Sequence, residues 1–194
     1  MTPERLEKIQ RVASHRRFDL TVILENVHDP HNISAVMRTC DAVGISEIYV
    51  IDNHIKFNKR IGKKSSSSAN KWLDVHSFQN IDDCLKMVKP KYQKLLCTHL
   101  NAEAVELYQQ DFSKGSLALV FGNEHDGVSS ELLAKCDGNI FIPQIGMISS
   151  LNISVACAVT LYEVFRQKKS SDNYQMDSQK QALLNRWMSV DNVD

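Results

Sequence analysis

Apolar residues in this chain gather into short runs that are separated by segments of helical spacing. The clearest runs are Leu20–Leu24, Ile48–Ile51, Leu95–Thr98, Leu117–Phe121 and Ile140–Ile142. Runs that are apolar at successive positions are typical of strands buried on both faces, as in a parallel sheet. A shorter strand is expected within residues 72–78. Because helical segments separate the runs, the pattern predicts an α/β fold with a mostly parallel sheet, flanked by helices and joined by right-handed crossovers.

Helices are expected between these runs and at both ends of the chain. Their predicted ranges are 3–15, 33–43, 81–88, 104–108, 130–136, 151–165 and 178–188. Residues 151–165 are apolar at nearly every position, which predicts a helix buried on all sides, too short and too interrupted to span a bilayer. The expected organisation is a basic N-terminal helical arm over residues 1–17, one domain over 18–168, and a linker and C-terminal helix over 169–194.

The composition favours an ordinary globular protein. Hydrophobic residues make up 43% and charged residues 24%, and the net charge is zero. The N-terminus lacks the apolar core of a signal peptide, and the five scattered cysteines suit reduced thiols in the cytoplasm. Neither the cysteines nor the seven histidines have metal-ligand spacing, so we expect no metal. No window is long and apolar enough for a transmembrane helix, so we expect no membrane partner.

The positive charge is segregated along the chain. Residues 1–17 are rich in arginine and lysine, and residues 53–71 carry six basic residues and no acidic one. Such segments either attract RNA phosphates or are solvated faces, and the sequence leaves both readings open. The candidate RNA-binding residues are Arg5, Arg11, Arg16, Lys63, Lys64 and Arg166.

Three polar loops follow predicted strands, over residues 25–32, 122–129 and 144–152. The carboxyl ends of parallel strands meet at one edge of a sheet, where ligands bind in open α/β folds. Gly122 and Gly127 would allow the backbone to approach a flat ligand closely, and Glu124 offers a carboxylate between them. The loop is neither a dinucleotide-binding nor a P-loop motif. In the structural alternative, Ser149 or Ser150 is a helix N-cap and Asn152 a capping partner in the first turn.

Taken together, the three loops resemble those of the TrmH branch of the SPOUT RNA 2′-O-ribose methyltransferases. The matching segments are Pro30–Cys40, Leu119–Ser129, Ile142–Gly146 and Ser150–Ala156, and the similarity covers about residues 18–168. The resemblance implies a SPOUT-type sheet whose C-terminal part, about residues 117–165, forms a deep trefoil knot. The hydrophobic pattern alone predicts an unknotted doubly wound sheet, because knots are rare. The resemblance also implies a homodimer that binds S-adenosyl-L-methionine (SAM) with its second and third loops.

Carried over residue by residue, the resemblance assigns a site. The implied catalytic residues are Arg38, Asn32, Glu124, Ser150 and Asn152. The implied SAM-binding residues are Leu100, Phe121, Gly122, Asn123, Glu124, Gly127, Ile142, Gln144, Gly146, Ser150, Leu151 and Asn152. Arg38 matches the family's catalytic arginine, and it is expected to approach the cofactor of the other subunit. Since an arginine stays protonated near neutral pH, we expect it to anchor and polarise the ribose–phosphate, with the base role proposed in the family as the alternative. Gln144 departs from the family pattern, which commonly has an apolar residue there.

The substrate is inferred from the ends of the chain. A short basic arm and a C-terminal helix look most like the family members that methylate the ribose of guanosine 18 in the D-loop of tRNA. The alternatives are a different tRNA or rRNA nucleotide and a non-catalytic knotted RNA-binding protein. The joint presence of Asn32, Arg38, Glu124 and Asn152 favours the enzyme, because RNA binding alone needs only the basic segments.

Overall fold

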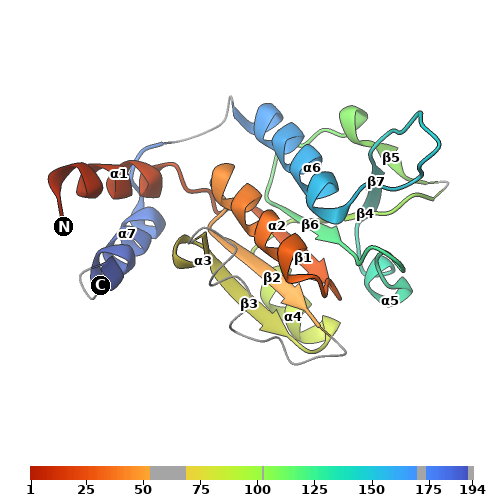
Figure 1. Ribbon diagram of the computed structural model, residues 1–194, viewed down its shortest axis with the longest axis horizontal. Helices are drawn as coiled ribbons and strands as arrows, with labels where there is room; N and C mark the ends of the chain where they lie inside the picture. The colour runs from red at the N-terminus through yellow and green to blue at the C-terminus, as the bar shows by residue number, and fades with distance from the viewer. Residues whose placement is uncertain (53–68, 102, 170–173, 192–194) are drawn as a thin grey trace.

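The computed structural model describes residues 1–52, 69–101, 103–169 and 174–191 (Figure 1). Within these ranges the chain forms one seven-stranded sheet with the order β3-β2-β1-β6-β4-β7-β5, and every neighbouring pair is parallel. The strands are β1 (Leu20–Glu25), β2 (Glu47–Ile51), β3 (Asp74–Phe78), β4 (Lys94–Thr98), β5 (Val105–Glu106), β6 (Leu117–Phe121) and β7 (Gly138–Phe141). The predicted α/β class with a parallel sheet is therefore confirmed.

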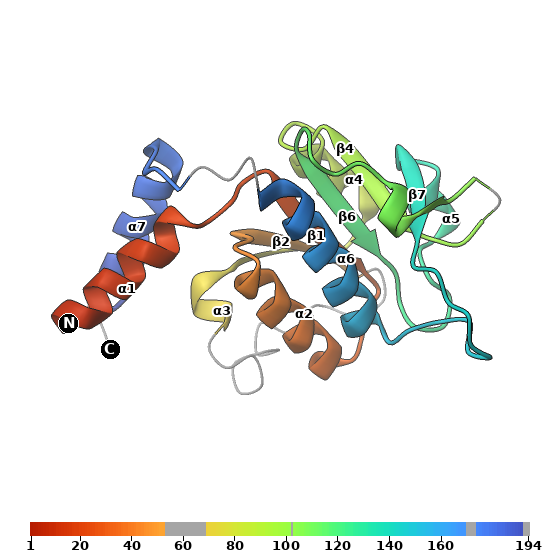
Figure 2. The same ribbon diagram turned by 90° about the horizontal axis from the view of Figure 1, so that it is seen from above.

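Helices cover both faces of the sheet (Figures 1 and 2). On one face, α2 (Pro30–Ala42) and α6 (Ile153–Lys168) pack against Val22, Leu24 and Leu119. On the other face, α4 (Ile81–Val88) and α5 (Ser130–Leu133) pack against Ile23 and Val120. Successive side chains of a strand point to opposite faces, so filling both layers requires apolar residues at all five positions of β6 and at Leu20 and Val22–Leu24 of β1.

The helices predicted over residues 33–43 and 104–108 need correction. Helix α2 begins at Pro30 rather than at residue 33, because Asp29 caps it: the Asp29 Oδ1 accepts a hydrogen bond of 2.8 Å from the His31 backbone N–H. Asn32 therefore lies in the first turn of a helix. The helix expected over residues 104–108 is instead strand β5 followed by the 3₁₀ turn η1 (Leu107–Gln109), because Val105 pairs with Ile140 at the edge of the sheet.

Helix α6 is not buried on all sides as its composition predicts. Val155 is 47% exposed and Tyr162 53% exposed, on the side turned away from the sheet, while Cys157 and Leu161 are fully buried. Its N-cap is Asn152, whose Oδ1 accepts from the Ser154 backbone N–H at 2.9 Å, and not Ser149 or Ser150. Among the described residues no helix is long and apolar enough to cross a membrane.

The first and last helices lie side by side at one end of the molecule (Figures 1 and 2). Ile9 and Ala13 of α1 (Pro3–Ser14) share a small core with Leu183, Leu184 and Trp187 of α7 (Ser178–Asp191). This core joins two segments that are more than 160 residues apart in the sequence, and it is separate from the cores on either face of the sheet.

Arg16 belongs to this junction, and its burial there argues against the predicted RNA-binding role. The residue is only 2% exposed, its guanidinium pairs with the Asp41 carboxylate, and its Nη1 donates to the Ile45 carbonyl at 2.7 Å. It also lies over the Trp187 ring, 5.2 Å from the centroid. An arginine buried and paired in this way holds the terminal helices to the domain and is not available to a phosphate.

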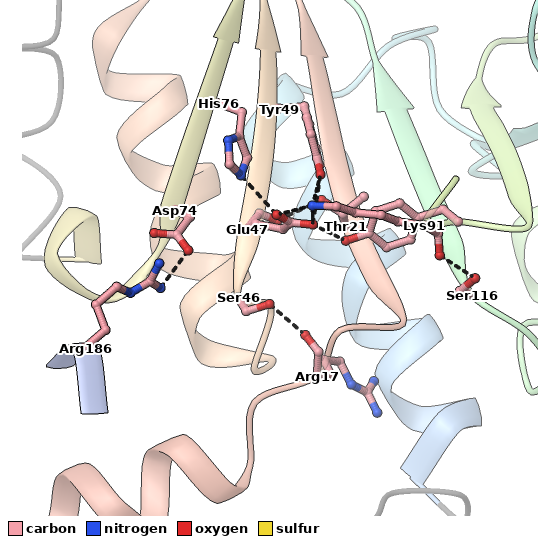
Figure 3. A network of polar contacts seen from close by, with 11 residues as sticks. Arg17, Thr21, Ser46, Glu47, Tyr49, Asp74, His76, Lys91, Ser116 and Arg186 are labelled. Atoms are coloured by element: carbon pink, nitrogen blue, oxygen red, sulfur yellow. Dashed lines mark hydrogen bonds and ion pairs between the residues drawn. The ribbon is translucent and has the colours of Figure 1, made fainter. Parts of the chain in front are cut away.

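A polar cluster closes the amino-terminal edge of the sheet (Figure 3). The Glu47 carboxylate accepts hydrogen bonds from the hydroxyls of Tyr49 and Tyr92, at 2.8 and 2.9 Å, and from Lys91 Nζ at 2.9 Å. His76 Nε2 lies 3.0 Å from the same carboxylate. Burial would raise the pKa of Glu47, but hydrogen bonds with His76, Lys91, Tyr49 and Tyr92 outweigh it and lower the pKa to about 2.

Candidate functional site

A cavity of about 570 Å³ opens at the carboxyl-terminal edge of the sheet, beyond β4, β6 and β7. This main cavity is lined by three stretches of chain, within residues 98–100, 121–127 and 140–156. Eleven of the twelve predicted SAM-binding residues line it: Leu100, Phe121, Gly122, Asn123, Glu124, Gly127, Ile142, Gln144, Gly146, Ser150 and Leu151. Asn152 does not line the cavity and instead caps α6 beside it. The cofactor role of these residues stays a prediction.

The glycines of the second loop allow its backbone to turn tightly. A Cβ added to Gly122 would lie 1.9 Å from the Gly127 carbonyl carbon, and Gly127 has a φ of +67°. Asn123 and Gly127 form an isolated antiparallel bridge, and Asn123 Oδ1 accepts from the backbone N–H groups of His125 and Asp126, at 2.8 and 2.7 Å. The loop therefore turns back tightly on its own backbone, which is a different use of glycine from the expected close approach to a ligand.

Three predicted catalytic residues meet in one hydrogen-bonded network. Asn32 Nδ2 donates to Glu124 Oε1, and Asn152 Nδ2 donates to Asn32 Oδ1 at 3.1 Å. Asn152 Oδ1 in turn accepts from Ser154 Oγ at 2.6 Å and caps the helix that follows. These residues come from the start of α2, the second loop and the start of α6, so the network ties all three segments together beside the main cavity.

Arg38 lies outside this network within one chain. It is six residues beyond Asn32 in α2, which places it about 9 Å along the helix axis and about 120° around it. The side chain is exposed, and within the described part of the chain it makes no hydrogen bond or ion pair. Ser150, the remaining predicted catalytic residue, lines the main cavity. The structure thus brings together four of the five predicted catalytic residues and leaves Arg38 on the surface.

Glu25 is a site residue that the sequence analysis missed. It was expected in a polar loop, but it ends β1 and is only 1% exposed. Its carboxylate accepts from the Ser129 backbone N–H at 2.7 Å and from Ser129 Oγ at 2.6 Å. Ser129 is the N-cap of α5 and closes the second loop. Glu25 therefore holds one end of that loop while Asn32 holds Glu124 within it. A buried apolar run that ends in a carboxylate is the signal that would have indicated this residue.

The remaining RNA-binding candidates lie on several surfaces. Arg5 and Arg11 are exposed on α1. Arg166, on α6, keeps an exposed guanidinium that pairs with Glu163 at 2.8 Å, and this hydrogen bond raises the pKa of Arg166. Lys63 and Lys64 lie outside the described residues. The RNA-binding role of Arg5, Arg11 and Arg166 stays a prediction.

Comparison with known proteins identifies the family. The sequence profile of the SpoU rRNA Methylase family matches residues 19–162, which include all three loops and all seven strands of the sheet. The chain belongs to the SpoU methylase family. The predicted resemblance to this group of methyltransferases is therefore confirmed.

Relatives in the SpoU family match almost the whole chain. The tRNA (guanosine(18)-2'-O)-methyltransferase of Thermus thermophilus is 39% identical over 176 residues, which cover 89% of this chain and 88% of that protein. The crystal structure of the TrmH/SpoU tRNA modifying enzyme of A. aeolicus superposes with a TM-score of 0.85 at 33% identity, covering 97% of this chain and 96% of that one. The SpoU methyltransferase AviRb of Streptomyces viridochromogenes, solved with AdoMet, gives a TM-score of 0.71 at 26% identity, covering 80% of this chain and 60% of that one.

Proposed function

We propose that this protein transfers a methyl group from SAM to the ribose 2′-oxygen of guanosine 18 in tRNA. The observation that carries the proposal is the network of Asn32, Glu124 and Asn152 beside the main cavity, in a SpoU-family chain. The substrate is supported by relatives of similar length whose name is tRNA (guanosine(18)-2'-O)-methyltransferase.

The main cavity suits SAM in size and lining. Its volume of about 570 Å³ lies within the range of small-molecule sites. Phe121, Ile142 and Leu151 offer apolar surface for an adenine ring, and Gln144 and Glu124 offer polar groups for the ribose and the amino acid part. The AdoMet complex of a SpoU methyltransferase supports the same assignment. When bound, SAM supplies an electrophilic methyl group on a sulfonium.

The residues of the chain have to position and activate a weak nucleophile. A ribose hydroxyl needs help to lose its proton and needs its oxygen in line with the methyl group. Asn32 fixes one oxygen of the Glu124 carboxylate, which leaves the second oxygen to accept a hydrogen bond from the ribose. Arg38 anchors the adjacent phosphate and polarises the hydroxyl through its guanidinium group. Ser150, at the rim of the main cavity, offers a further hydroxyl to the ribose or to the cofactor.

Arg38 does not line the main cavity of its own chain, so we propose a homodimer in which Arg38 of one subunit approaches the main cavity of the other. The apolar side chains exposed along the third loop and α6, including Met147, Leu151, Val155 and Tyr162, support an interface there. A trefoil knot formed by about residues 117–165 belongs to the same proposal. We also propose a cytoplasmic location, which the five free cysteines support.

The proposal is tested with purified protein and tRNA transcripts. A transcript with guanosine 18 should gain one methyl group in the presence of SAM, and the same transcript with 2′-deoxyguanosine at position 18 should gain none. Methylation of the deoxyguanosine transcript, or of a ribosomal RNA fragment only, would contradict the proposed substrate. Binding of tRNA without any methyl transfer would instead support the non-catalytic alternative.

A further inference from the structure

A second cavity, of about 430 Å³, adjoins the main cavity. This side cavity is lined by His28, Asp29 and Asn32 from the start of α2, and by residues 123–126 of the second loop. Residues 123–126 also line the main cavity, so the two spaces share one wall. A nucleotide whose ribose reaches the methyl donor in the main cavity therefore has its base within reach of the side cavity.

The lining of the side cavity favours one kind of ligand. Every residue of its wall is polar or ionisable, three of them are the carboxylates Asp29, Glu124 and Asp126, and none is lysine or arginine. Such a wall repels a phosphate and accepts hydrogen bonds from a neutral group that carries N–H donors. The Watson–Crick edge of guanine carries such donors side by side, at N1 and at the exocyclic N2, whereas the N1 of adenine is an acceptor. His28 and His125 add flat rings of the kind on which unstacked RNA bases rest.

Among the three carboxylates, Asp126 has most of its hydrogen-bonding capacity left. Asp29 Oδ1 caps α2, and Glu124 Oε1 is bonded to Asn32. Asp126 is exposed, and its carboxylate Oδ2 accepts a long hydrogen bond of 3.5 Å from Asn123 Nδ2. Its backbone N–H is held by Asn123 Oδ1 at 2.7 Å, which fixes the position of the residue while its carboxylate lines the cavity.

We propose that the side cavity receives the guanine base of the acceptor nucleotide and that Asp126 determines the base specificity by accepting from guanine N1–H and N2–H. This inference rests on the proposed function and extends it to the base that the enzyme recognises. Glu124, which lines both cavities, and Asn32, which is hydrogen-bonded to it, would then face the ribose, and Asp126 would face the base. A base held in this way is drawn out of the RNA stack, as single-stranded RNA recognition requires.

The experiment compares two transcripts that differ only at position 18, one with guanosine and one with inosine, which lacks the N2 amino group. The measured quantity is the ratio of their kcat/KM values at saturating SAM, for the wild type, Asp126→Asn and Asp126→Ala. Asp111→Asn, an exposed carboxylate outside both cavities, is the matched control. Because the ratio is taken within one enzyme, any loss of folded protein or of SAM affinity in a variant cancels.

We expect the wild type and Asp111→Asn to prefer guanosine by about tenfold or more, the effect of one hydrogen bond to a charged group. Both Asp126 variants should bring the ratio close to one, mainly by losing activity on guanosine. If the Asp126 variants keep the wild-type ratio, or if the wild type does not distinguish the two bases, the inference is wrong and the proposed function stands. If the wild type methylates neither transcript, the proposed function fails and the inference falls with it.

Discussion

At the scale of single residues, Gly122 and Gly146 both line the main cavity but have different surroundings. A Cβ at Gly122 would meet the backbone of Gly127, whereas a Cβ at Gly146 would have nothing within 4 Å. Gly122→Ala should therefore displace the second loop and lower SAM affinity by more than tenfold, and Gly146→Ala should change it by about twofold or less. Isothermal titration of both variants with SAM measures the difference. Wild-type affinity in Gly122→Ala would show that the turn does not shape the site.

Substitution of Arg38 leads to a different prediction, because this residue lines neither the main cavity nor the side cavity. Arg38→Ala should reduce turnover at saturating tRNA by about a thousandfold, the range for removing a cation that stabilises a reacting group, with SAM affinity nearly unchanged. Arg11→Ala, on the exposed side of α1, is the matched charge control. It should weaken tRNA binding, lower the salt dependence by about one counterion, and keep turnover at saturation. If Arg38→Ala behaves like Arg11→Ala, then Arg38 is a docking residue.

The sequence indicates a residue of this site when its role can be recognised from the residues around it in the chain. Glu124 stands out as a carboxylate in a loop that follows a buried strand, the family resemblance adds Asn32 and Asn152, and the three residues do meet. Arg16 looked like its basic neighbours in the sequence, and only the packing of α7 and the carboxylate of Asp41 show it to be structural. A structural role such as that of Arg16 cannot be predicted from neighbouring residues, because its partners are distant in the sequence.

At the scale of elements, Glu47 links β2 to β3 and to the segment after α4 (Figure 3). Its pKa of about 2 lies below the ordinary value of 4.5 that it regains on unfolding. A carboxyl with a lowered folded-state pKa stabilises the fold fully above the unfolded pKa, and this stabilisation is lost as the pH falls from about 4.5 to about 2. The difference corresponds to about 3 kcal/mol at neutral pH.

Glu47→Gln should accordingly lower the free energy of unfolding by about 3 kcal/mol at pH 7 and by clearly less at pH 3. Urea unfolding at the two pH values measures this. Glu103→Gln, an exposed carboxylate on the loop after β4, should change stability by less than about 0.5 kcal/mol at either pH. An equal loss for Glu47→Gln at both pH values would mean that the carboxylate charge is not what stabilises the cluster.

The strands were predictable because each core run has to fill two packing layers, which leaves a continuous apolar signal. The elements that the pattern misjudged depend on partners elsewhere. Val105 is in a strand because Ile140 offers a free edge, and α2 starts early because Asp29 caps it. Helix α6 looked fully buried because its outer apolar face, with Val155 and Tyr162, has the same composition as its inner face.

At the scale of the whole molecule, the exposed apolar face of α6 leads us to predict that the protein is a homodimer in solution. Light scattering should give about twice the monomer mass of 22.0 kDa. Val155→Glu should shift the mass toward the monomer and lower turnover, because the partner's Arg38 is lost with the interface. Met87→Glu, an exposed apolar residue of α4 on the opposite face of the sheet, should leave both unchanged. A Val155→Glu monomer with full activity would contradict the homodimer.

The packing of the two terminal helices, α1 and α7, against each other could not be predicted from the sequence. Both terminal helices were predicted, but their mutual packing through Ile9, Ala13 and Trp187 depends on a contact between residues at opposite ends of the chain. The expected division into arm, domain and C-terminal helix stays a prediction, although α1 and α7 share one small core. The parallel sheet, in contrast, followed from local patterns.

The most direct test of the central claim is ribose-methylation mapping of total RNA from cells with and without the gene. The account predicts that methylation of the 2′-oxygen of guanosine 18 in tRNA disappears without the gene and returns with the wild-type chain. It should fail to return with Arg38→Ala. Loss of a methyl group from ribosomal RNA, or from another tRNA position with guanosine 18 unaffected, would contradict the account.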